Sequence, residues 1–293
     1  MNATTSAQPP RLFDRNEVAQ LLVPVMADQR SDRGVGVALQ LAEDWDLPVT
    51  LLHIGALDGD ADAPPSAVAD MAIDLRRHHP AVTIETEAFD HEDVAIAIAE
   101  AAGSDTLVVL ATDHASQWLG DDSVAERLVQ RRSAPLLLIG PRARGYHASG
   151  EVIVALDGTR LAEDGVAVGL ALAAAAETAV RVVTVIPTAT LEHIEHLKER
   201  GQRVSESSYL RELADGLVDQ PAPVAWEIVH GEEAIDELVD LAARRHAAML
   251  VATTHAGTGA VRQRFGSTSM GLVERATVPV MIVHPVGHQS SMG

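Results

Sequence analysis

The stretch Ala248-Met-Leu-Val-Ala-Thr-Thr-His-Ala256 occurs in a second form earlier in the chain, as Thr106-Leu-Val-Val-Leu-Ala-Thr-Asp-His-Ala115. Both copies are apolar runs that end in the pattern Ala-Thr-x-His-Ala, the clearest single match between the two halves of the sequence. Each copy is followed by a helical segment and by a final apolar run that a proline precedes. Self-similarity of this kind indicates a tandem repeat, so the chain is best interpreted as two copies of one unit.

The other parts of the two halves repeat as well. Short runs rich in Val, Leu and Ile alternate with segments that carry apolar residues at helical spacing. This alternation is typical of βαβ units and predicts a parallel sheet. The matching pairs are Leu21–Val25 with Val152–Leu156, Gly34–Glu43 with Gly165–Ala174, Val49–Ile54 with Val180–Val185, and Val94–Ala102 with Ala234–Arg245.

The repeat predicts an α/β protein of two tandem Rossmann-like domains, each a five-stranded parallel sheet with helices on both faces. Each domain would have about 130 to 140 residues, an ordinary domain size. Pro, Gly and Ser interrupt both periodicities near residue 145, which is typical of a linker. The expected organisation is a tail at 1–15, a first domain at 16–141, a linker at 142–150, a second domain at 151–286 and a tail at 287–293.

Composition excludes several functional classes. The 293 residues include 42 Asp and Glu against 22 Lys and Arg, a formal net charge of −20. Such a charge disfavours binding to nucleic-acid phosphates and to anionic membranes. The absence of cysteine removes disulfides, thiol nucleophiles and cysteine zinc sites. With no long apolar run and no signal-peptide pattern at the start, a soluble cytoplasmic protein is expected.

The loop after Thr253 is the best candidate for chemistry. Gly257 and Gly259 favour a tight turn, and Gly266, Ser267 and Ser269 precede a helix expected at Met270–Ala276. Glycine, hydroxyl groups and a helix N-terminus are the ingredients of a phosphate site. The alternative is an ordinary helix cap, which uses the same residue types.

Three segments of the second half resemble the universal stress protein family. Its ATP-binding members carry Gly-x-x-Gly, nine residues and then Gly-Ser or Gly-Thr, and the frame Thr253-x-x-Ala256, nine residues, Gly266-Ser267 fits that spacing. Ile153–Thr159 is similar to the family's first strand, and Val273–Val283 to its last helix and strand. The resemblance covers both halves and implies a tandem member with adenine nucleotide alpha hydrolase-like domains.

The resemblance also implies a nucleotide site in the second half, with ATP as the ligand and Mg²⁺ as its companion. Asp157 would hold adenine, with Val185 and Val229 beside it. Thr253 and Ala256 replace the family's two glycines, so side chains stand where ribose and phosphates approach the backbone. The full set is Ala155, Asp157, Val185, Val229, Ala252, Thr253, Ala256, Gly266, Ser267, Thr268 and Ser269, with Arg262 and Arg264 as further cations in the loop.

The first half departs further from this pattern. Met26 stands where the adenine aspartate would be, and Asp122 replaces the glycine of the phosphate loop. Counted from Thr112, that loop is three residues shorter than its counterpart. Asp121 and Asp122 would repel a polyphosphate by roughly 1 kcal/mol per unit pair even in water. We expect no ATP here, and Trp118 would either face a partner or cap the sheet.

Two further features bear on partners and metals. His193 and His196 share a helix face but lack the spacing of a zinc protease, so a solvated face is expected and no metal site is assigned. The prolines Pro135 and Pro279 precede apolar fifth strands. In the family this strand joins domains in an antiparallel contact, which implies an internal pseudo-dimer and leaves a chain-to-chain homodimer open.

The leading function is therefore a non-catalytic, nucleotide-responsive stress protein acting on an unidentified protein partner. A scaffold that has lost nucleotide is the alternative, based on Met26, Asp122, Thr253 and Ala256. An enzyme has the least support, because the chain contains no Walker A loop and no Gly-x-Ser-x-Gly elbow. Slow ATP hydrolysis stays open.

Overall fold

The described residues of the first half form five strands and four helices. The computed structural model describes residues 18–25, 32–55, 66–103, 105–112, 123–131, 134–188, 222–254 and 267–284. The elements of the first half, in chain order, are β1 (Gln20–Val25), α1 (Asp32–Trp45), β2 (Val49–Ile54), α2 (Ser66–His78), β3 (Ile84–Phe89), α3 (Val94–Ala101), β4 (Thr106–Ala111), α4 (Val124–Arg131) and β5 (Leu136–Ile139).

The second half repeats this order within its described residues. Its elements are β6 (Val152–Leu156), α5 (Arg160–Ala175), β7 (Val180–Pro187), β8 (Val224–Gly231), α8 (Ala234–Arg244), β9 (Met249–Thr253), α9 (Ser267–Arg275) and β10 (Val280–Val283). The pair of histidines at 193 and 196 lies outside the described residues.

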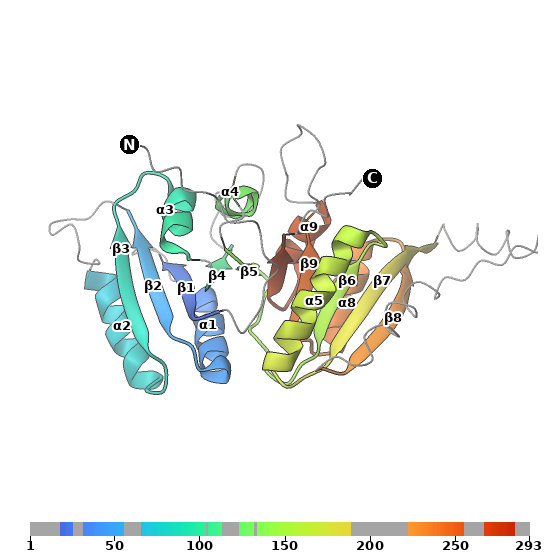
Figure 1. The fold of residues 1–293 in the computed structure, drawn as a ribbon, viewed down its shortest axis with the longest axis horizontal. Helices are drawn as coiled ribbons and strands as arrows, with labels where there is room; N and C mark the ends of the chain where they lie inside the picture. Colours follow the sequence, from blue (N-terminus) through green and yellow to red (C-terminus); the bar gives the residue numbers. More distant parts are fainter. Residues whose placement is uncertain are drawn as a thin grey trace, which may run out of the picture.

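The ten strands form one continuous sheet in the order β3-β2-β1-β4-β5-β10-β9-β6-β7-β8. All pairings within each half are parallel, which confirms the predicted five-stranded parallel sheets. At the centre β5 and β10 run antiparallel, with Leu137 opposite Met281. The two halves therefore lie side by side and meet at their fifth strands (Figure 1), the internal contact that the family resemblance implies.

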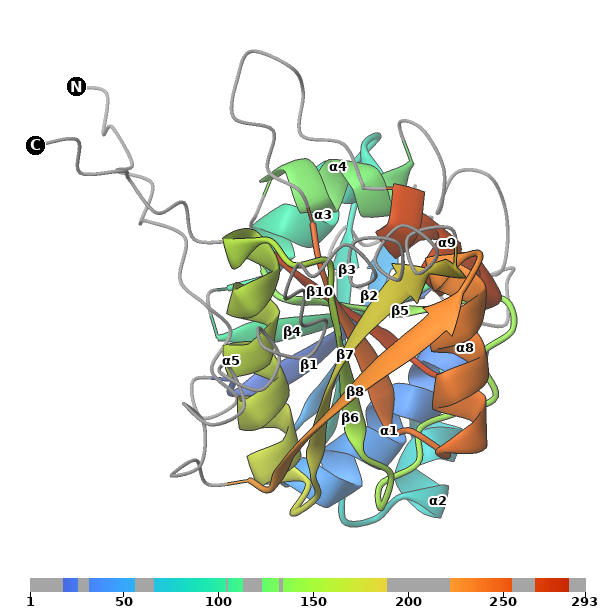
Figure 2. The same cartoon turned by 90° about the vertical axis from the view of Figure 1, so that its right-hand side faces the viewer.

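Helices cover both faces of the sheet because the strands are apolar on both sides. Val152, Val154 and Leu156 of β6 pack in one core cluster with residues of α1, α2 and α5. Ile153 packs in the other, with residues of α3, α4, α8 and α9. Figure 2 shows α5 and α8 on opposite sides of the strands of the second half. Each cluster contains residues of both halves, so the cores are continuous across the molecule.

The sheet register corrects one sequence match by a single residue. Ala111 and Thr253 lie opposite the last residue of β5 and of β10, respectively. The backbone N–H groups of Thr112 and Thr254 then donate to the carbonyls of those last residues, at 2.9 Å in both halves. Thr112 is thus the counterpart of Thr254, whereas the pattern Ala-Thr-x-His-Ala aligns it with Thr253. That alignment is wrong because ladder pairing, not letter identity, fixes the position of a residue in a sheet.

Proline is tolerated in the central strand β1 for a local reason. A proline inside a central strand removes a ladder donor and is normally excluded. Here the pairing of β1 with β4 stops at Leu22, opposite Val108, while pairing with β2 continues to Val25. Pro24 therefore lies where β1 and β4 have already separated.

The segment that follows β5, residues 140–146, begins in the first half and packs against both halves, and we call it the strap. Tyr146 is only 5% exposed. The N–H of Arg144 donates to the carbonyl of Thr277, 2.9 Å away in the second half. The N–H of Tyr146 donates to the side-chain oxygen of Gln40 on α1, 3.3 Å away in the first half. The strap is thus part of the packed structure rather than a bare tether.

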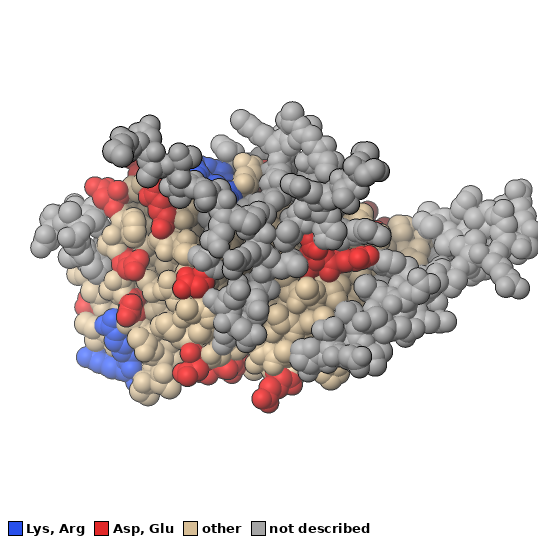
Figure 3. All heavy atoms as spheres, viewed as in Figure 1, with Lys and Arg blue, Asp and Glu red and all other residues tan. Residues whose placement is uncertain are grey.

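The surface agrees with the acidic composition. Acidic side chains are spread over the face shown in Figure 3, and basic ones gather at few places on it. Among the described residues, no helix combines the length and the apolar character needed to cross a membrane.

Candidate functional site

In the second half, two neighbouring strands separate at their carboxyl ends. β6 and β9 are paired only as far as Val154 opposite Val251, although β6 runs on to Leu156 and β9 to Thr253. The strand order reverses at this point, because β7 continues the sheet on one side and β10 on the other. In open α/β sheets, ligands bind in the crevice beyond the strands at such a switch point.

Asp157 is held in a tight turn at the mouth of this crevice. Its Oδ1 accepts hydrogen bonds from the backbone N–H of Thr159, at 2.9 Å, and from the Thr159 hydroxyl, at 2.7 Å. Thr159 in turn caps α5, because its Oγ1 accepts from the N–H of Ala162 at 3.3 Å. Gly158 has φ +83°, a conformation that favours glycine, and no described residue other than its chain neighbours lies within 4 Å of its Cβ position. The exposed carboxylate of Asp157 is therefore held in position by Thr159.

Three predicted site residues, Ala155, Val185 and Val229, lie on one apolar face of the sheet, and we call them the platform. Val185 on β7 lies directly opposite Val229 on β8. Both are half-buried, and both pack with Ala155 against the core cluster on the side of α8 and α9. Ala252, which is 4% exposed, belongs to the same cluster. These four residues thus lie on the same face of the sheet.

The side chain of Thr253 lies on the other face. A Cβ atom built on Gly165 of α5 would stand 2.9 Å from Thr253 Oγ1 and 3.7 Å from a methyl of Val251. The hydroxyl is buried and has no hydrogen-bond partner among the described residues. Thr253 is therefore accommodated between β9 and α5, away from the platform of Ala155, Val185 and Val229. The replacement of the family's glycine by Thr253 therefore adds no side chain to the side of the crevice that faces α8 and α9.

The helix after the candidate phosphate loop begins earlier than the sequence indicated. We predicted Met270–Ala276, whereas α9 spans Ser267–Arg275. Thr268 and Ser269 are therefore in its first turn, Thr268 exposed and Ser269 only 3% exposed. Residues with side-chain hydroxyls can occupy the cap of a helix and also its first turn. The pattern of apolar residues alone did not reveal this earlier start. The backbone N–H groups of this turn make the helix end suitable for an anion.

Several predicted site residues lie outside the described part of the chain. They are Ala256 and Gly266, and the side chain of Ser267 is not described either. The same holds for the loop cations Arg262 and Arg264 and for Met26, Trp118, Asp121 and Asp122 of the first half.

The corresponding position of the first half is occupied by Ala111. Its Cβ lies 3.2 Å from the Cβ position of Gly34 on α1, as Thr253 lies against Gly165. With Ala111 as the counterpart of Thr253, 11 residues separate Ala111 from Ser123 and 13 separate Thr253 from Ser267. The first loop is thus two residues shorter than the second, and the predicted difference of three is wrong because it rested on the shifted alignment.

Sequence reasoning missed Gly165 and Thr159. The recurrence of a glycine at the same place in both halves, Gly34 and Gly165, was the available signal for a close approach of helix and strand. The spacing of Asp157, Thr159 and Ala162 was the signal for an aspartate-supported helix cap. Among the described residues, no group of three or more His, Asp or Glu side chains is arranged to hold a metal ion.

A polar pocket of about 440 Å³ lies at the opposite edge, where the strands of the second half begin. The C-terminal ends of α5 and α8 reach this edge, and the partial negative charge of their carbonyls disfavours phosphate. We therefore place the candidate site at the switch point rather than in this pocket. The pocket is lined by His147, Ser149, Gly150, Glu151, Thr178, Arg245 and His246.

Comparison with known proteins agrees with this architecture. The family model described as the universal stress protein family matches residues 150–284. No curated protein matches the chain.

Solved structures extend the likeness to the first half. A universal stress protein from Archaeoglobus fulgidus DSM 4304 has a TM-score of 0.61 and 14% identity, over 93% of this chain and 99% of that one. A putative universal stress protein from Pseudomonas aeruginosa UCBPP-PA14 has a TM-score of 0.58 and 19% identity, over 92% and 95%. The cytoplasmic domain of a prokaryotic cation chloride cotransporter has a TM-score of 0.50 and 14% identity, over 93% and 97%. These identities show the shared fold, and the fold alone does not fix a function.

Proposed function

Residues 150–284 match the universal stress protein family, and from this match we propose that the chain is an adenine-nucleotide-binding stress protein with its site in the second half. The ligand would be ATP, with Mg²⁺ bound to its phosphates. We also propose the division into domains at 16–141 and 151–286, with the nucleotide confined to the latter.

The observation that carries the proposal is the direction of the Thr253 side chain. A threonine in place of glycine would obstruct a nucleotide if its side chain entered the crevice. It is instead packed under Gly165 of α5, on the face away from Ala155, Val185 and Val229. An apolar platform beside a fixed carboxylate matches the needs of an adenine ring, which stacks on apolar side chains and offers an amino group as a donor.

The phosphate end of the ligand would lie at the first turn of α9. The N–H groups at Ser267, Thr268 and Ser269 are at the positive end of the helix dipole, which stabilises an anion by roughly 0.3–1 kcal/mol when exposed. Gly266, whose missing side chain would permit close approach, completes this cradle in the proposal. Because the chain has a net charge of −20, a polyphosphate needs a local site that favours negative charge in order to bind.

The proposed role is binding rather than catalysis. ATP occupancy would alter the surface that the protein presents to a partner, in a cytoplasmic setting. Asp157 already accepts two hydrogen bonds from Thr159 and so has a structural task besides contacting a ligand. A general base for hydrolysis is not needed for this role.

The test is to release and identify bound nucleotide. Purified full-length protein is denatured, its supernatant is analysed for adenine nucleotides, and binding of ATP, ADP, AMP and cyclic AMP is measured by calorimetry. Asp157→Ala and Gly266→Glu should each reduce ATP affinity at least tenfold, which corresponds to about 1.4 kcal/mol.

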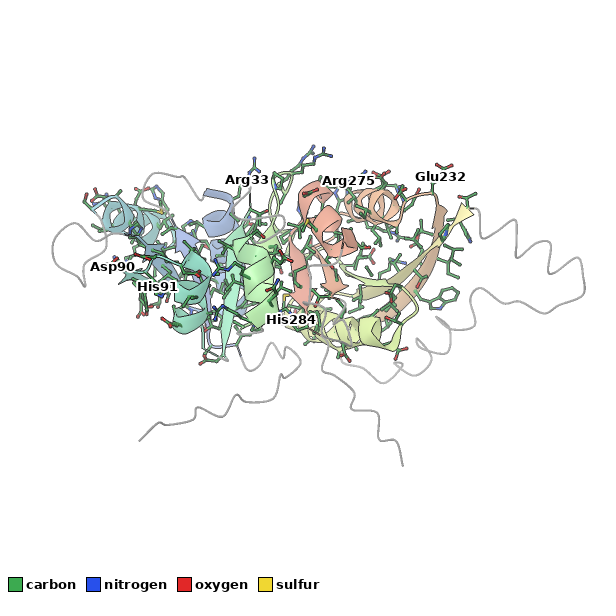
Figure 4. The ribbon with its side chains drawn as sticks, turned by 90° about the horizontal axis from the view of Figure 1, so that it is seen from above. Arg33, Asp90, His91, Glu232, Arg275 and His284 are labelled. Atoms are coloured by element: carbon green, nitrogen blue, oxygen red, sulfur yellow. The ribbon has the colours of Figure 1, made fainter. Side chains whose placement is uncertain are left out.

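The matched control is Asp90→Ala. Asp90 is an exposed acid that follows β3 in the first half, at the far end of the molecule from Glu232, which follows β8 (Figure 4). Removing its carboxylate should leave ATP affinity unchanged. A wild-type protein that carries no nucleotide and gives no calorimetric signal with any of the four ligands would favour the scaffold alternative instead.

A further inference from the structure

The first half of the chain makes a backbone contact with α9, the helix of the proposed phosphate cradle. Gly140 directly follows β5 and is buried. A Cβ atom on Gly140 would stand 1.8 Å from the carbonyl oxygen of Val273 and 2.9 Å from its carbonyl carbon. No side chain fits in that space, so the two backbones touch and only glycine is compatible with the observed position of α9.

A second contact fixes the same region of the chain. The N–H of Arg144 donates to the carbonyl of Thr277 at 2.9 Å, two residues beyond the end of α9. Val273 and Leu272 are fully buried in the core on this side. The strap therefore contacts α9 within its last turns and again just after its end, while core packing holds its inner face.

The strap is in turn fixed to α1 of the first half. The Arg33 guanidinium donates to the carbonyl of Pro141, and the N–H of Tyr146 donates to Gln40 Oε1 at 3.3 Å. Figure 4 shows Arg33 and Arg275, the last residue of α9, on the same side of the molecule, with His284 on the other. The contacts thus run from α1 through the strap to α9.

From this arrangement we infer that Gly140, a residue of the first half, positions α9 and thereby the phosphate-binding end of the nucleotide site in the second half. The inference rests on the proposed function. Val273 lies six positions after Ser267, about 9 Å along a helix, so α9 moves as a rigid body over this distance. A side chain at residue 140 must displace the helix or the strap, and any shift of α9 carries its first-turn N–H groups with it.

A positioning role of Gly140 predicts a different pattern of ligand affinities from a general loss of stability. A displaced α9 weakens contacts to phosphate, whereas adenine and ribose rest on Asp157 and the apolar platform. Gly140→Ala should therefore lower ATP affinity at least tenfold and leave adenosine affinity within twofold. Hydrogen bonds to charged groups are among the stronger ones, so the loss of a single hydrogen bond to phosphate accounts for this factor.

The experiment compares ATP and adenosine binding by calorimetry in the full-length chain. Gly36→Ala is the matched control, since Gly36 is an exposed glycine of α1 and, outside the backbone of that helix, no described residue lies within 4 Å of its Cβ position. It should change neither affinity. If Gly140→Ala does not fold, as judged by circular dichroism, Gln40→Ala takes its place. Freeing the strap from α1 in this way should lower ATP affinity roughly threefold, again without affecting adenosine.

The outcomes separate the two proposals. Wild-type protein that binds neither ligand overturns the nucleotide site and this inference together. Wild-type protein that binds both, with strap variants that weaken both ligands equally or neither, overturns the positioning role of Gly140 alone.

Discussion

A Cβ atom built on Gly165 of α5 would stand 2.9 Å from the hydroxyl oxygen of Thr253 at the end of β9. The same relationship recurs in the first half, where the Cβ position of Gly34 lies 3.2 Å from the Cβ of Ala111. In both halves a helix glycine thus makes room for the side chain that ends the fourth strand. In the second half this room accommodates Thr253, which is larger than Ala111.

The first prediction follows from this pair. Gly165→Ala should lower the free energy of unfolding by roughly 1–3 kcal/mol, because the added methyl overlaps Thr253 Oγ1 and helix and strand must separate. Adding Thr253→Ala should restore at least half of the loss. Urea denaturation of the two single variants and the double variant measures the coupling. Strictly additive effects would show that the two residues do not share the space.

Tyr146 gives a prediction for alkaline pH. Burial raises the pKa of Tyr146 to about 12, and the carboxylate of Asp44 adds to the rise. An ordinary tyrosine pKa is about 10. The native state therefore holds the proton more tightly, so the contribution to stability is complete below about pH 10 and is lost between about pH 10 and 12. Tyrosinate absorbance followed against pH should show this delayed ionisation.

Tyr146→Phe is the matching substitution. The phenol oxygen is buried, and no residue in the described part of the chain hydrogen-bonds to it. Its removal should therefore leave stability at pH 7 unchanged or raise it by roughly 1 kcal/mol, and should remove the alkaline loss. A destabilisation at pH 7 would reveal a partner for the hydroxyl.

Asp93 gives a prediction for acid pH. The hydrogen bond from Arg127 lowers the pKa of Asp93, burial opposes this effect, and the N–H groups of Ile96 and Ala95 lower the pKa further. A depressed pKa means that the carboxylate stabilises the fold above the ordinary value of about 3.9, and that this contribution is lost as pH falls through the folded-state value. Arg127→Gln should move the midpoint of acid unfolding to higher pH, as measured by circular dichroism.

Asp93→Asn provides the control for the helix cap. Oδ1 of Asp93 accepts from Ala95 and Ile96 at the start of α3. Asparagine is an equally good cap, so α3 should persist while the acid dependence contributed by this carboxylate disappears. An unchanged acid midpoint in the Arg127 variant would contradict the assigned cause.

The continuous cores predict that both halves unfold together. Trp45 on α1 and Trp226 on β8 report on the first and second half, respectively. Single-tryptophan variants that retain one or the other should show the same urea midpoint, because each core cluster includes residues of both halves. Leu137→Ala at the central pairing should lower both midpoints equally, with a loss of roughly 2–5 kcal/mol. Two separate midpoints would contradict a shared core.

The fold could be predicted from the sequence because its signals are periodic and occur twice. Alternating apolar runs and helical patterns placed the strands and helices, and Pro135 and Pro279 marked the starts of the fifth strands. Alignment of the repeated motif misplaced Thr112 by one residue, because a short motif can recur at positions that do not correspond in the hydrogen-bonded register of the sheet. Only the pairing of Thr253 with β10 and of Ala111 with β5 corrected it.

The candidate site could be predicted less completely. Asp157, Val185 and Val229 were named from the sequence and lie at the carboxyl ends of β6, β7 and β8. The direction of the Thr253 side chain could not be inferred, since it depends on Gly165, 88 positions earlier in the chain. The contact of Gly140 with α9 escaped notice for the same reason: backbone contacts between distant segments leave only an isolated glycine in the sequence.

The most direct test of the account is the stoichiometry of ATP binding to the intact chain, measured by calorimetry with wild-type protein and with Gly266→Glu. The account predicts one ATP per chain, lost when the second-half cradle is blocked, because the first half carries Asp121 and Asp122 in its shorter loop. Two ATP molecules per chain, none, or one that persists in Gly266→Glu would contradict it.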